Sequence, residues 1–297
     1  MKEEKYIFMS VVIPVYNDPA GIVITLNSLI SQNYPKEKYE IIVVDNNSTD
    51  NTRKTINRIA KNYSGLIKIL KERKIQTSYA ARNRGINSAN GELLAFIDSD
   101  MWMDKDWLLE ILNYYKKKNF SYLGCKIIIT ANKNNIFEKY NIITGFPVKD
   151  YLRDAHFAPT AALIVKKSLF YKVGLFKQFL VSGGDFEFGN RVYKAGIKQY
   201  YVEDIKIYHP ARSSFRSLLR KYLRVGSGNL QLSKIDKKYA NFGLKSFFPI
   251  SPWKFLKLYN ARPKNVSEVD FMLIYLLDYF MKLTVVSSFL KNKFKKL

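Results

Sequence analysis

Residues 8–17 read Phe8-Met9-Ser10-Val11-Val12-Ile13-Pro14-Val15-Tyr16-Asn17, an apolar β-branched run that ends in turn residues. A segment with helical period follows at residues 20–32, and a second apolar run follows at residues 41–44. Short apolar runs that alternate with longer helical segments predict strands joined by helices. Such units form a parallel sheet with helices on both faces.

The same alternation continues to residue 117. Residues 66–70 and 93–97 are predicted strands, and residues 51–62, 78–90 and 107–117 are predicted helices. An α/β fold is therefore expected for the first part of the chain.

After residue 118 the pattern is looser. Strand-like runs stand at residues 122–129 and 160–166, and a polar stretch at residues 132–141 separates them.

Polar clusters follow three of the predicted strands. They occupy residues 14–17, 45–50 and 98–100. In open α/β sheets ligands bind beyond the carboxyl ends of the strands, so these three loops are predicted to share one rim.

Asp98-Ser99-Asp100 places two carboxylates at a strand end. Oxygen ligands suit Mg²⁺ or Mn²⁺, and such a metal would neutralise a leaving diphosphate. The alternative is that Asp100 or Asp104 only caps the helix that begins at Trp107.

Asp45 follows the buried run 41–44 directly. Its carboxylate would accept a hydrogen bond from a nucleobase N–H while Tyr16 or Pro14 packs on the base. Alternatively Asp45 shapes a turn and Ser48 or Asp50 caps the next helix, and the two roles are compatible.

Four motifs in this order resemble those of the family 2 glycosyltransferases. They are Val11-Val12-Ile13-Pro14-Val15-Tyr16-Asn17, Val43-Val44-Asp45-Asn46-Asn47-Ser48-Thr49-Asp50, Ala81-Arg82-Asn83-Arg84-Gly85-Ile86 and Phe96-Ile97-Asp98-Ser99-Asp100. The resemblance covers residues 8–230 and implies a GT-A fold, which is Rossmann-like with a mostly parallel central sheet flanked by helices. It also implies inverting transfer. The chain lacks the Gln-x-x-Arg-Trp signature of processive relatives, so addition of a single sugar is expected.

The resemblance also implies roles for individual residues. The donor, a UDP-sugar by the family's habit, would be bound by Pro14, Tyr16, Asp45, Arg82, Asp98 and Ser99. Mn²⁺ or Mg²⁺ would be held by Asp98, Asp100 and His209.

The catalytic base of the family normally belongs to a pair of acids that opens a helix. Here Asp185 matches the second acid, and Gly184 replaces the first, which removes a neighbouring negative charge. The alternative is that Asp185 only caps the helix that runs to Lys194. Glu187 is the reserve candidate for the base.

Weaker candidates belong to the acceptor or to a phosphate group. His156 would orient an acceptor hydroxyl. Arg216, Arg220 and Arg224 form a row at i, i+4 and i+8 whose mutual repulsion an anion would relieve. The anion would be the donor diphosphate or a phosphorylated lipid acceptor, and a solvated cationic face is the common alternative.

The chain carries 49 Lys and Arg against 25 Asp and Glu, a formal charge of +24. This charge favours anionic partners. Aromatic and basic residues interleave in the C-terminal part, which suits the headgroup boundary of an anionic bilayer. They are Lys245, Phe247, Phe248, Trp253, Lys254, Phe255 and Lys257.

Residues 271–290 are long and apolar enough to suggest a membrane span, but Asp278 and Lys282 fall inside them. Each central charge costs about 2.5–3.5 kcal/mol on insertion. We therefore predict a helix that lies in the membrane interface. A core helix or a dimer helix is the alternative, so an oligomer through this helix is possible.

These patterns predict a catalytic domain at residues 1–230, with the nucleotide-sugar half at residues 1–100 and the acceptor half at residues 101–230. A helical, basic, membrane-associating tail would follow at residues 231–297. The expected acceptor is a glycan or a lipid-linked glycan, and no nucleic-acid partner is expected.

The lone cysteine, Cys125, and the lack of a signal peptide pattern favour a cytoplasmic protein, peripheral on the inner face of the cell membrane. The alternative function is a catalytically degenerate module of the same fold that binds anionic lipid or nucleic acid, and Gly184 is the residue that favours it.

Overall fold

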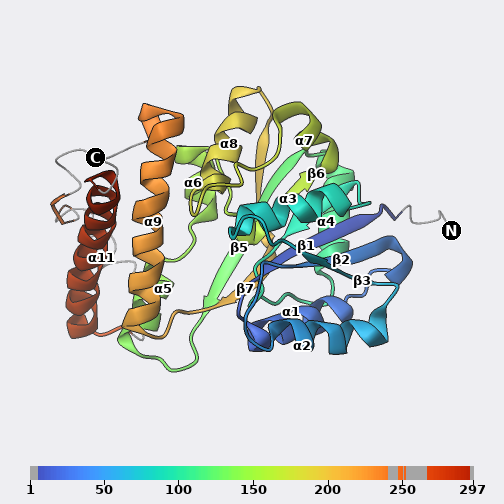
Figure 1. Ribbon diagram of the computed structural model, residues 1–297, viewed down its shortest axis with the longest axis horizontal. Helices are drawn as coiled ribbons and strands as arrows, with labels where there is room; N and C mark the ends of the chain where they lie inside the picture. The colour runs from blue at the N-terminus through green and yellow to red at the C-terminus, as the bar shows by residue number, and fades with distance from the viewer. Residues whose placement is uncertain (1–5, 240–246, 250, 252–265, 295–297) are drawn as a thin grey trace. The chain divides into compact units, whose positions relative to one another are not determined.

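The computed structural model describes residues 6–239, 247–249, 251 and 266–294. Seven strands from these residues form one sheet in the order β3-β2-β1-β4-β6-β5-β7 (Figure 1). The strands are β1 (Met9–Val15), β2 (Tyr39–Asp45), β3 (Ile67–Lys71), β4 (Leu93–Phe96), β5 (Tyr122–Thr130), β6 (Leu163–Lys166) and β7 (Gln199–Pro210).

The four strands β3, β2, β1 and β4 are parallel, as the alternating pattern predicts. Val11 of β1 lies opposite Ile41 of β2 and Ala95 of β4. Every residue of β1 and β2 is buried, because helices cover both faces of this part of the sheet.

The remaining strands make the sheet mixed. β6 pairs antiparallel with β4 and with β5. The strand predicted at residues 160–166 is shorter than expected, because Thr160–Ala162 form a 3-10 turn before β6 begins.

The chain divides into two compact units, and most of the sheet belongs to the first, which comprises residues 1–128, 146–179 and 184–209. Its helices are α1 (Pro19–Ile30), α2 (Thr52–Ala60), α3 (Ser78–Ser88), α4 (Trp107–Lys118), α6 (Val148–Ala155), α7 (Lys167–Val173) and α8 (Gly184–Lys194). Side-chain caps fix where two of them begin. The Asp18 carboxylate accepts from the Gly21 N–H at 2.9 Å before α1, and the Thr77 hydroxyl accepts from the Ala80 N–H at 3.1 Å before α3.

The second unit comprises residues 129–145, 180–183 and 210–297. Its helices are α5 (Ile136–Thr144), α9 (Phe215–Ile235) and α11 (Glu268–Phe294). They share an apolar core made of Tyr140, Leu218, Val266, Phe271, Ile274 and Met281. Gly226 lets α9 approach α11 closely, because a Cβ there would lie 2.4 Å from the Val285 carbonyl oxygen.

Helix α5 occupies most of the polar stretch that the sequence left unassigned. Asn135 caps it by accepting hydrogen bonds from the Phe137 and Glu138 N–H groups, at 3.1 and 3.0 Å. Tyr140 buries its ring completely. Ile136, Phe137, Tyr140 and Ile143 have helical spacing, but the asparagines and lysines before and among them make the stretch polar as a whole.

Helix α11 is longer than the helix predicted at residues 271–290. Within the described ranges, no helix is long and apolar enough to cross a membrane. Cys125 is buried in β5. Five residues of the predicted aromatic and basic stretch lie outside the described residues, namely Lys245, Trp253, Lys254, Phe255 and Lys257.

Gly91 offers a test of how tightly the sheet is packed before β4. An added Cβ would lie 2.4 Å from the Ser10 backbone nitrogen and 2.8 Å from the Leu93 carbonyl oxygen. Backbone atoms cannot move aside cheaply, so Gly91→Ala should lower the free energy of unfolding by about 2 kcal/mol. Urea unfolding followed by circular dichroism measures this difference.

Gly65→Ala is the matched control, because no heavy atom lies within 4 Å of its added Cβ. Equal stabilities of the two variants would contradict the packing described for Gly91.

Candidate active site

The loops that follow β1, β2 and β4 are joined by hydrogen bonds. The Asn17 N–H donates to the Ser48 hydroxyl at 3.1 Å, and its amide donates to the Thr49 hydroxyl at 3.1 Å. The Ser99 hydroxyl donates to the Asp18 carboxylate at 2.9 Å. The three polar clusters therefore share one rim, as predicted from their positions directly after three strands.

Asp45 ends β2 at this rim and is 4% exposed. One carboxylate oxygen accepts from the Ser48 N–H at 3.0 Å, and the other lies 3.2 Å from Arg53 Nη1. Asp45 thus shapes the turn, and its role toward a nucleobase stays a prediction. Of the two residues expected to pack on the base, Tyr16 is 47% exposed, whereas Pro14 is buried within β1.

Several Lys and Arg side chains lie near Asp45, and no sequence motif indicated them. Arg53 pairs with it directly. The pKa of Lys71 is lowered by desolvation and by the charges of Arg53 and Arg73, while Asp45 raises it. Positive side chains that lie close together repel one another, and a bound anion would relieve this repulsion. Arg53 belongs to α2, whereas Lys71 ends β3 and Arg73 follows it, so residue spacing did not show that the three lie together.

Arg82 of α3 carries its guanidinium to the Asp98 carboxylate. Its Nη2 lies 2.6 Å from Asp98 Oδ1, and the Arg82 side chain is 4% exposed. The guanidinium also lies over the Tyr79 ring, at 5.5 Å from the ring centre. The Arg82 Nε is buried without a hydrogen-bond partner among the described residues. A buried unsatisfied N–H is costly, and a phosphate oxygen would satisfy it.

We call the three predicted metal ligands, Asp98, Asp100 and His209, the acidic edge. Asp100 Oδ1 lies 3.8 Å from His209 Nε2, and the Asp100 side chain is 38% exposed. Adjacent ligands of an octahedral ion with bonds of about 2.1 Å lie about 3 Å apart, so a small closure would let both atoms bind one ion.

No group of three or more His, Cys, Asp or Glu that could hold a metal occurs in the described part of the chain. Mg²⁺ is commonly bound by one or two carboxylates together with waters and substrate phosphates. The 3.8 Å between Asp100 and His209 is compatible with a metal whose shell a substrate diphosphate completes, whereas the three predicted ligands do not form a metal site closed by protein alone.

Asp185 opens α8, and the Tyr79 hydroxyl donates to its carboxylate at 3.2 Å. Burial raises the pKa of Asp185 above the usual carboxyl value. The Phe186 N–H, the Arg82 charge and the Tyr79 hydrogen bond act in the opposite direction. A carboxylate with raised proton affinity that the Tyr79 hydroxyl and the Phe186 N–H hold in place is suited to accept a proton.

The glycine before Asp185 has a packing reason. A Cβ on Gly184 would lie 2.8 Å from two atoms of the Tyr79 ring. The ring that donates to Asp185 therefore occupies the space where the resemblance leads one to expect an acidic side chain. Tyr79 was not among the predicted site residues, although it stands three residues before Arg82, one turn away on the same helix face.

Glu187 is 2% exposed and belongs to a structural ion pair. Its two carboxylate oxygens lie 2.7 and 3.0 Å from Arg191 Nε and Nη2. Arg191 in turn donates to the carbonyls of Val173, Gly174 and Leu175. The structure thus ties the reserve base to the end of α7.

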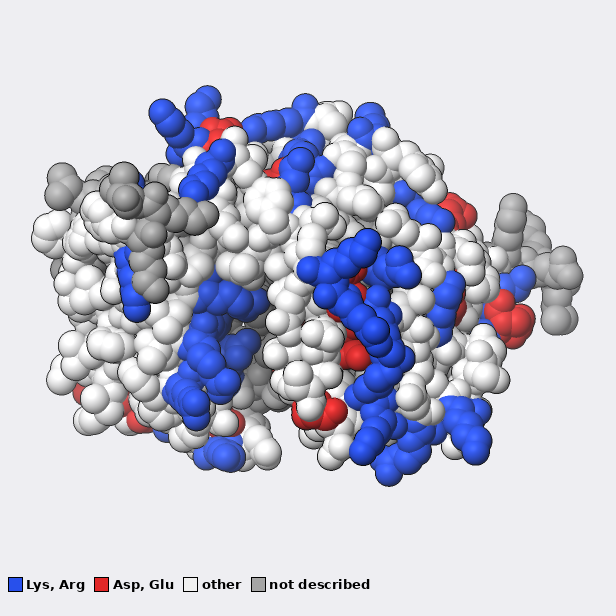
Figure 2. Space-filling model, viewed as in Figure 1, with Lys and Arg blue, Asp and Glu red and all other residues white. Residues whose placement is uncertain are grey.

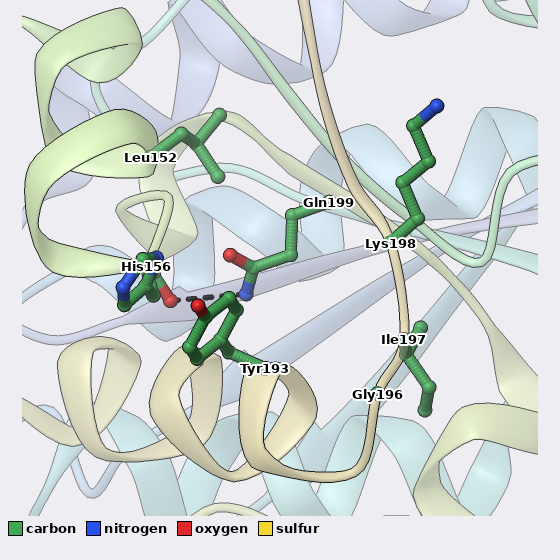
Figure 3. Close-up of a pocket in the computed structure, with 7 residues that line it drawn as sticks. All are labelled: Leu152, His156, Tyr193, Gly196, Ile197, Lys198 and Gln199. Atoms are coloured by element: carbon green, nitrogen blue, oxygen red, sulfur yellow. Dashed lines mark hydrogen bonds between the residues drawn. The ribbon is translucent and has the colours of Figure 1, made fainter.

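His156 lies at the other end of α8 from Asp185. It ends α6 with a left-handed backbone, φ 56°, and its ring stacks on Tyr193 at 3.6 Å between centres and 4° between planes. Together with Leu152 and Gln199 the two rings line an open pocket of about 350 Å³ (Figure 3). Tyr193 follows Asp185 by eight residues, about 12 Å along the helix.

Arg216, Arg220 and Arg224 belong to α9 in the second unit, and all three are exposed. Lys221 on the same helix was not predicted to matter. Its pKa is lowered to about 8 by burial first and then by Arg212 and Arg224. The helix thus carries a concentrated positive charge.

The chain is similar in sequence to known glycosyltransferases. Residues 10–180 match the sequence model described as Glycosyl transferase family 2. The chain is 34% identical over 262 residues to glycosyltransferase AglE of Haloferax volcanii, covering 88% of this chain and 84% of the relative. It is 28% identical over 246 residues to the dolichyl N-acetyl-alpha-D-glucosaminyl phosphate 3-beta-D-2,3-diacetamido-2,3-dideoxy-beta-D-glucuronosyltransferase of Methanococcus voltae, covering 79% and 76%.

Solved structures with a similar fold include the following two. Mannosyltransferase PcManGT from Pyrobaculum calidifontis, in complex with GDP-Man and Mn²⁺, has a TM-score of 0.66 at 17% identity, covering 99% of this chain and 89% of the other. TarS 1-349 of S. aureus, in complex with UDP-GlcNAc, has a TM-score of 0.56 at 18% identity, covering 96% and 92%. Because the family match spans more than half of the sequence, the chain belongs to glycosyl transferase family 2 and is a glycosyltransferase with the GT-A fold.

Proposed function

We propose that the protein moves a sugar from a UDP-sugar donor to a hydroxyl acceptor, with inversion, in the assembly of a cell-surface glycan or glycolipid. The observation that carries this proposal is a chain of contacts. Asp98 meets Arg82 at 2.6 Å, Arg82 covers the Tyr79 ring, and Tyr79 donates to Asp185 at 3.2 Å. One continuous set of side chains thus joins the acidic edge to the base.

In this proposal the rim binds the nucleotide. Tyr16 and Asp45 take the uridine with Ser99 nearby, and the buried Nε of Arg82 donates to a diphosphate oxygen. Asp98, Asp100 and His209 would hold Mn²⁺ or Mg²⁺. Bound there, the metal would neutralise charge on the departing diphosphate. The complexes of the similar structures with GDP-Man and Mn²⁺ and with UDP-GlcNAc support this assignment.

Asp185 acts on the acceptor. Its carboxylate takes the proton of the acceptor hydroxyl while that oxygen bonds to the anomeric carbon of the sugar. The bond from that carbon to the diphosphate breaks on the opposite face, so the configuration inverts and UDP leaves. Tyr79 and the Phe186 N–H hold the carboxylate in place during this step.

The acceptor is proposed to be a glycan or a lipid-linked glycan. The name of the Methanococcus voltae relative, which includes a dolichyl phosphate, supports a lipid-linked acceptor. Arg216, Arg220 and Arg224 would take its phosphate, and His156 is a weaker candidate for a contact with its sugar.

The proposed division of labour places donor binding in residues 1–100, acceptor binding in residues 101–230 and membrane association in residues 231–297. The positive charge of the chain supports a position on the anionic inner face of the cell membrane.

Asp185→Asn tests the base. The amide cannot take a proton, so the rate of sugar transfer should fall by about 10²–10⁴-fold, while UDP binding measured by calorimetry stays unchanged. Asp204→Asn, which alters an exposed carboxylate of β7, is the control and should keep full activity. Full activity of Asp185→Asn would remove Asp185 from the mechanism.

Asp100→Asn tests the metal. Nucleotide release should be measured across a panel of sugar nucleotides while Mn²⁺ is titrated. Loss of a direct ligand should raise the Mn²⁺ requirement at least about 10-fold, the smaller of the effects seen for outer-shell partners. If the unaltered protein uses no donor yet binds DNA or vesicles tightly, the degenerate binding module replaces the transferase proposal.

Tyr79→Phe tests the hydrogen bond to the base and keeps the ring that packs on Gly184. Asp185 must be deprotonated to accept a proton, and the Tyr79 bond lowers its pKa. Removal of this bond should raise that pKa, so the acid limb of the kcat/KM profile should move to higher pH. An acid limb that stays in place or moves down would contradict the assignment.

A further inference from the structure

An exposed apolar stripe runs along one side of α11. Its side chains are large, apolar and about half exposed or more: Val269 68%, Met272 64%, Leu273 49%, Leu276 57% and Phe280 48%. At about 100° per residue, the five positions fall within an arc of about 100°. We call these five residues the α11 stripe. A soluble helix normally turns such a row toward its own core.

The other side of α11 already serves that core. Phe271, Ile274 and Met281 are 0–3% exposed and pack with Tyr140 and Leu218 of the same unit. The α11 stripe is therefore a second apolar surface that the described part of the unit leaves uncovered.

The arc stays free of charge over most of the helix. Continued at the same angle per residue, it passes Leu283, Leu290 and the 63% exposed Phe294, and its first charged residue is Lys291. From Val269 to Phe294 the helix rises about 38 Å. A surface of this length is suited to lie flat on an extended apolar layer.

Two exposed aromatic residues are fixed beside the α11 stripe. Phe247 and Phe248 are 46% and 63% exposed. Their carbonyl oxygens accept hydrogen bonds from the Tyr279 hydroxyl at 2.9 Å and from Lys282 Nζ at 2.8 Å. Tyr279 and Lys282 lie about 20° and 80° from one edge of the arc, so the aromatic pair is held on that side of the stripe.

The charge of this part of the chain selects the partner. Residues 210–297 contain 18 Lys and Arg against four Asp and Glu. Figure 2 shows Lys and Arg side chains gathered in bands on the face that it draws, with acidic side chains interspersed in the right-hand band. An apolar strip within a strongly basic region matches an anionic bilayer, whose headgroups attract cations above an apolar interior.

We propose that the α11 stripe, with Phe247 and Phe248, is the surface that enters an anionic bilayer, with α11 lying parallel to the membrane plane. This inference rests on the proposed membrane association and adds the side chains that make the contact. A second copy of the chain is the less suited occupant, because a symmetric dimer would place two strongly basic regions against each other.

The test compares two double variants of the full chain. Leu273→Ser with Leu276→Ser removes the middle of the α11 stripe. Tyr171→Ser with Phe179→Ser removes two side chains of the first unit that are 81% and 51% exposed. Flotation with vesicles of equal parts phosphatidylcholine and phosphatidylglycerol should show at least a tenfold loss of binding for the first variant and none for the second.

Three other results would overturn the proposal. The unaltered protein would fail to bind these vesicles, the stripe variant would bind them as well as the control, or light scattering would show a dimer that the stripe variant alone dissolves. If both variants have the unfolding midpoint of the unaltered protein, their fold is intact. Asp185→Asn should keep full vesicle binding, so failure of the catalytic proposal and failure of this one give different results.

A second measurement locates the surface directly. Cys125 is the only cysteine and is buried, so Met272→Cys can be labelled selectively with a polarity-sensitive dye. Its emission should shift to the blue when anionic vesicles are added, whereas the dye on Tyr171→Cys should not respond. Equal responses at both positions would contradict insertion through α11.

Discussion

The parallel register of β1 between β2 and β4 is the constraint on which the site depends. β1 and β2 are buried throughout, and a slip of one residue would turn every side chain to the other face of the sheet. This register ends β1 and β2 level, with Val15 opposite Asp45, and it ends β4 opposite Val12, so the three strands finish at the same side of the sheet. The loops that begin at Tyr16, Asn46 and Ile97 can then bond to one another, and their carboxylates gather at one edge.

The buried Arg82 connects this edge to the base. A cation that is almost fully buried must be paired, and Asp98 supplies the opposite charge. The same charge lowers the pKa of Asp185 against the effect of burial, with the Tyr79 ring between them. One side chain thus influences both Asp98, which is proposed to face the donor, and Asp185, which is proposed to act on the acceptor.

The parallel half of the fold and the shared rim followed from the sequence, because apolar period and turn residues are local signals. The roles of Tyr79, Arg53 and Lys71 did not, because each depends on contacts with other secondary-structure elements. Helix α5 was missed because the Asn and Lys residues before and within it make residues 132–141 polar as a whole. The packing reason for Gly184 required the position of a ring 105 residues earlier, which no motif contains.

A carboxylate inside the second unit determines how α11 is turned. Asp278 lies within 3.2 Å of the Tyr140 hydroxyl, and Asp270, two turns earlier, is 2.8 Å from Lys139 Nζ. Both partners belong to α5. If α11 rolled about its long axis, both polar contacts would break together and Asp278 would lose its partner. The helix therefore has one preferred rotation, and the row of large apolar side chains keeps a fixed outward direction even before any partner arrives.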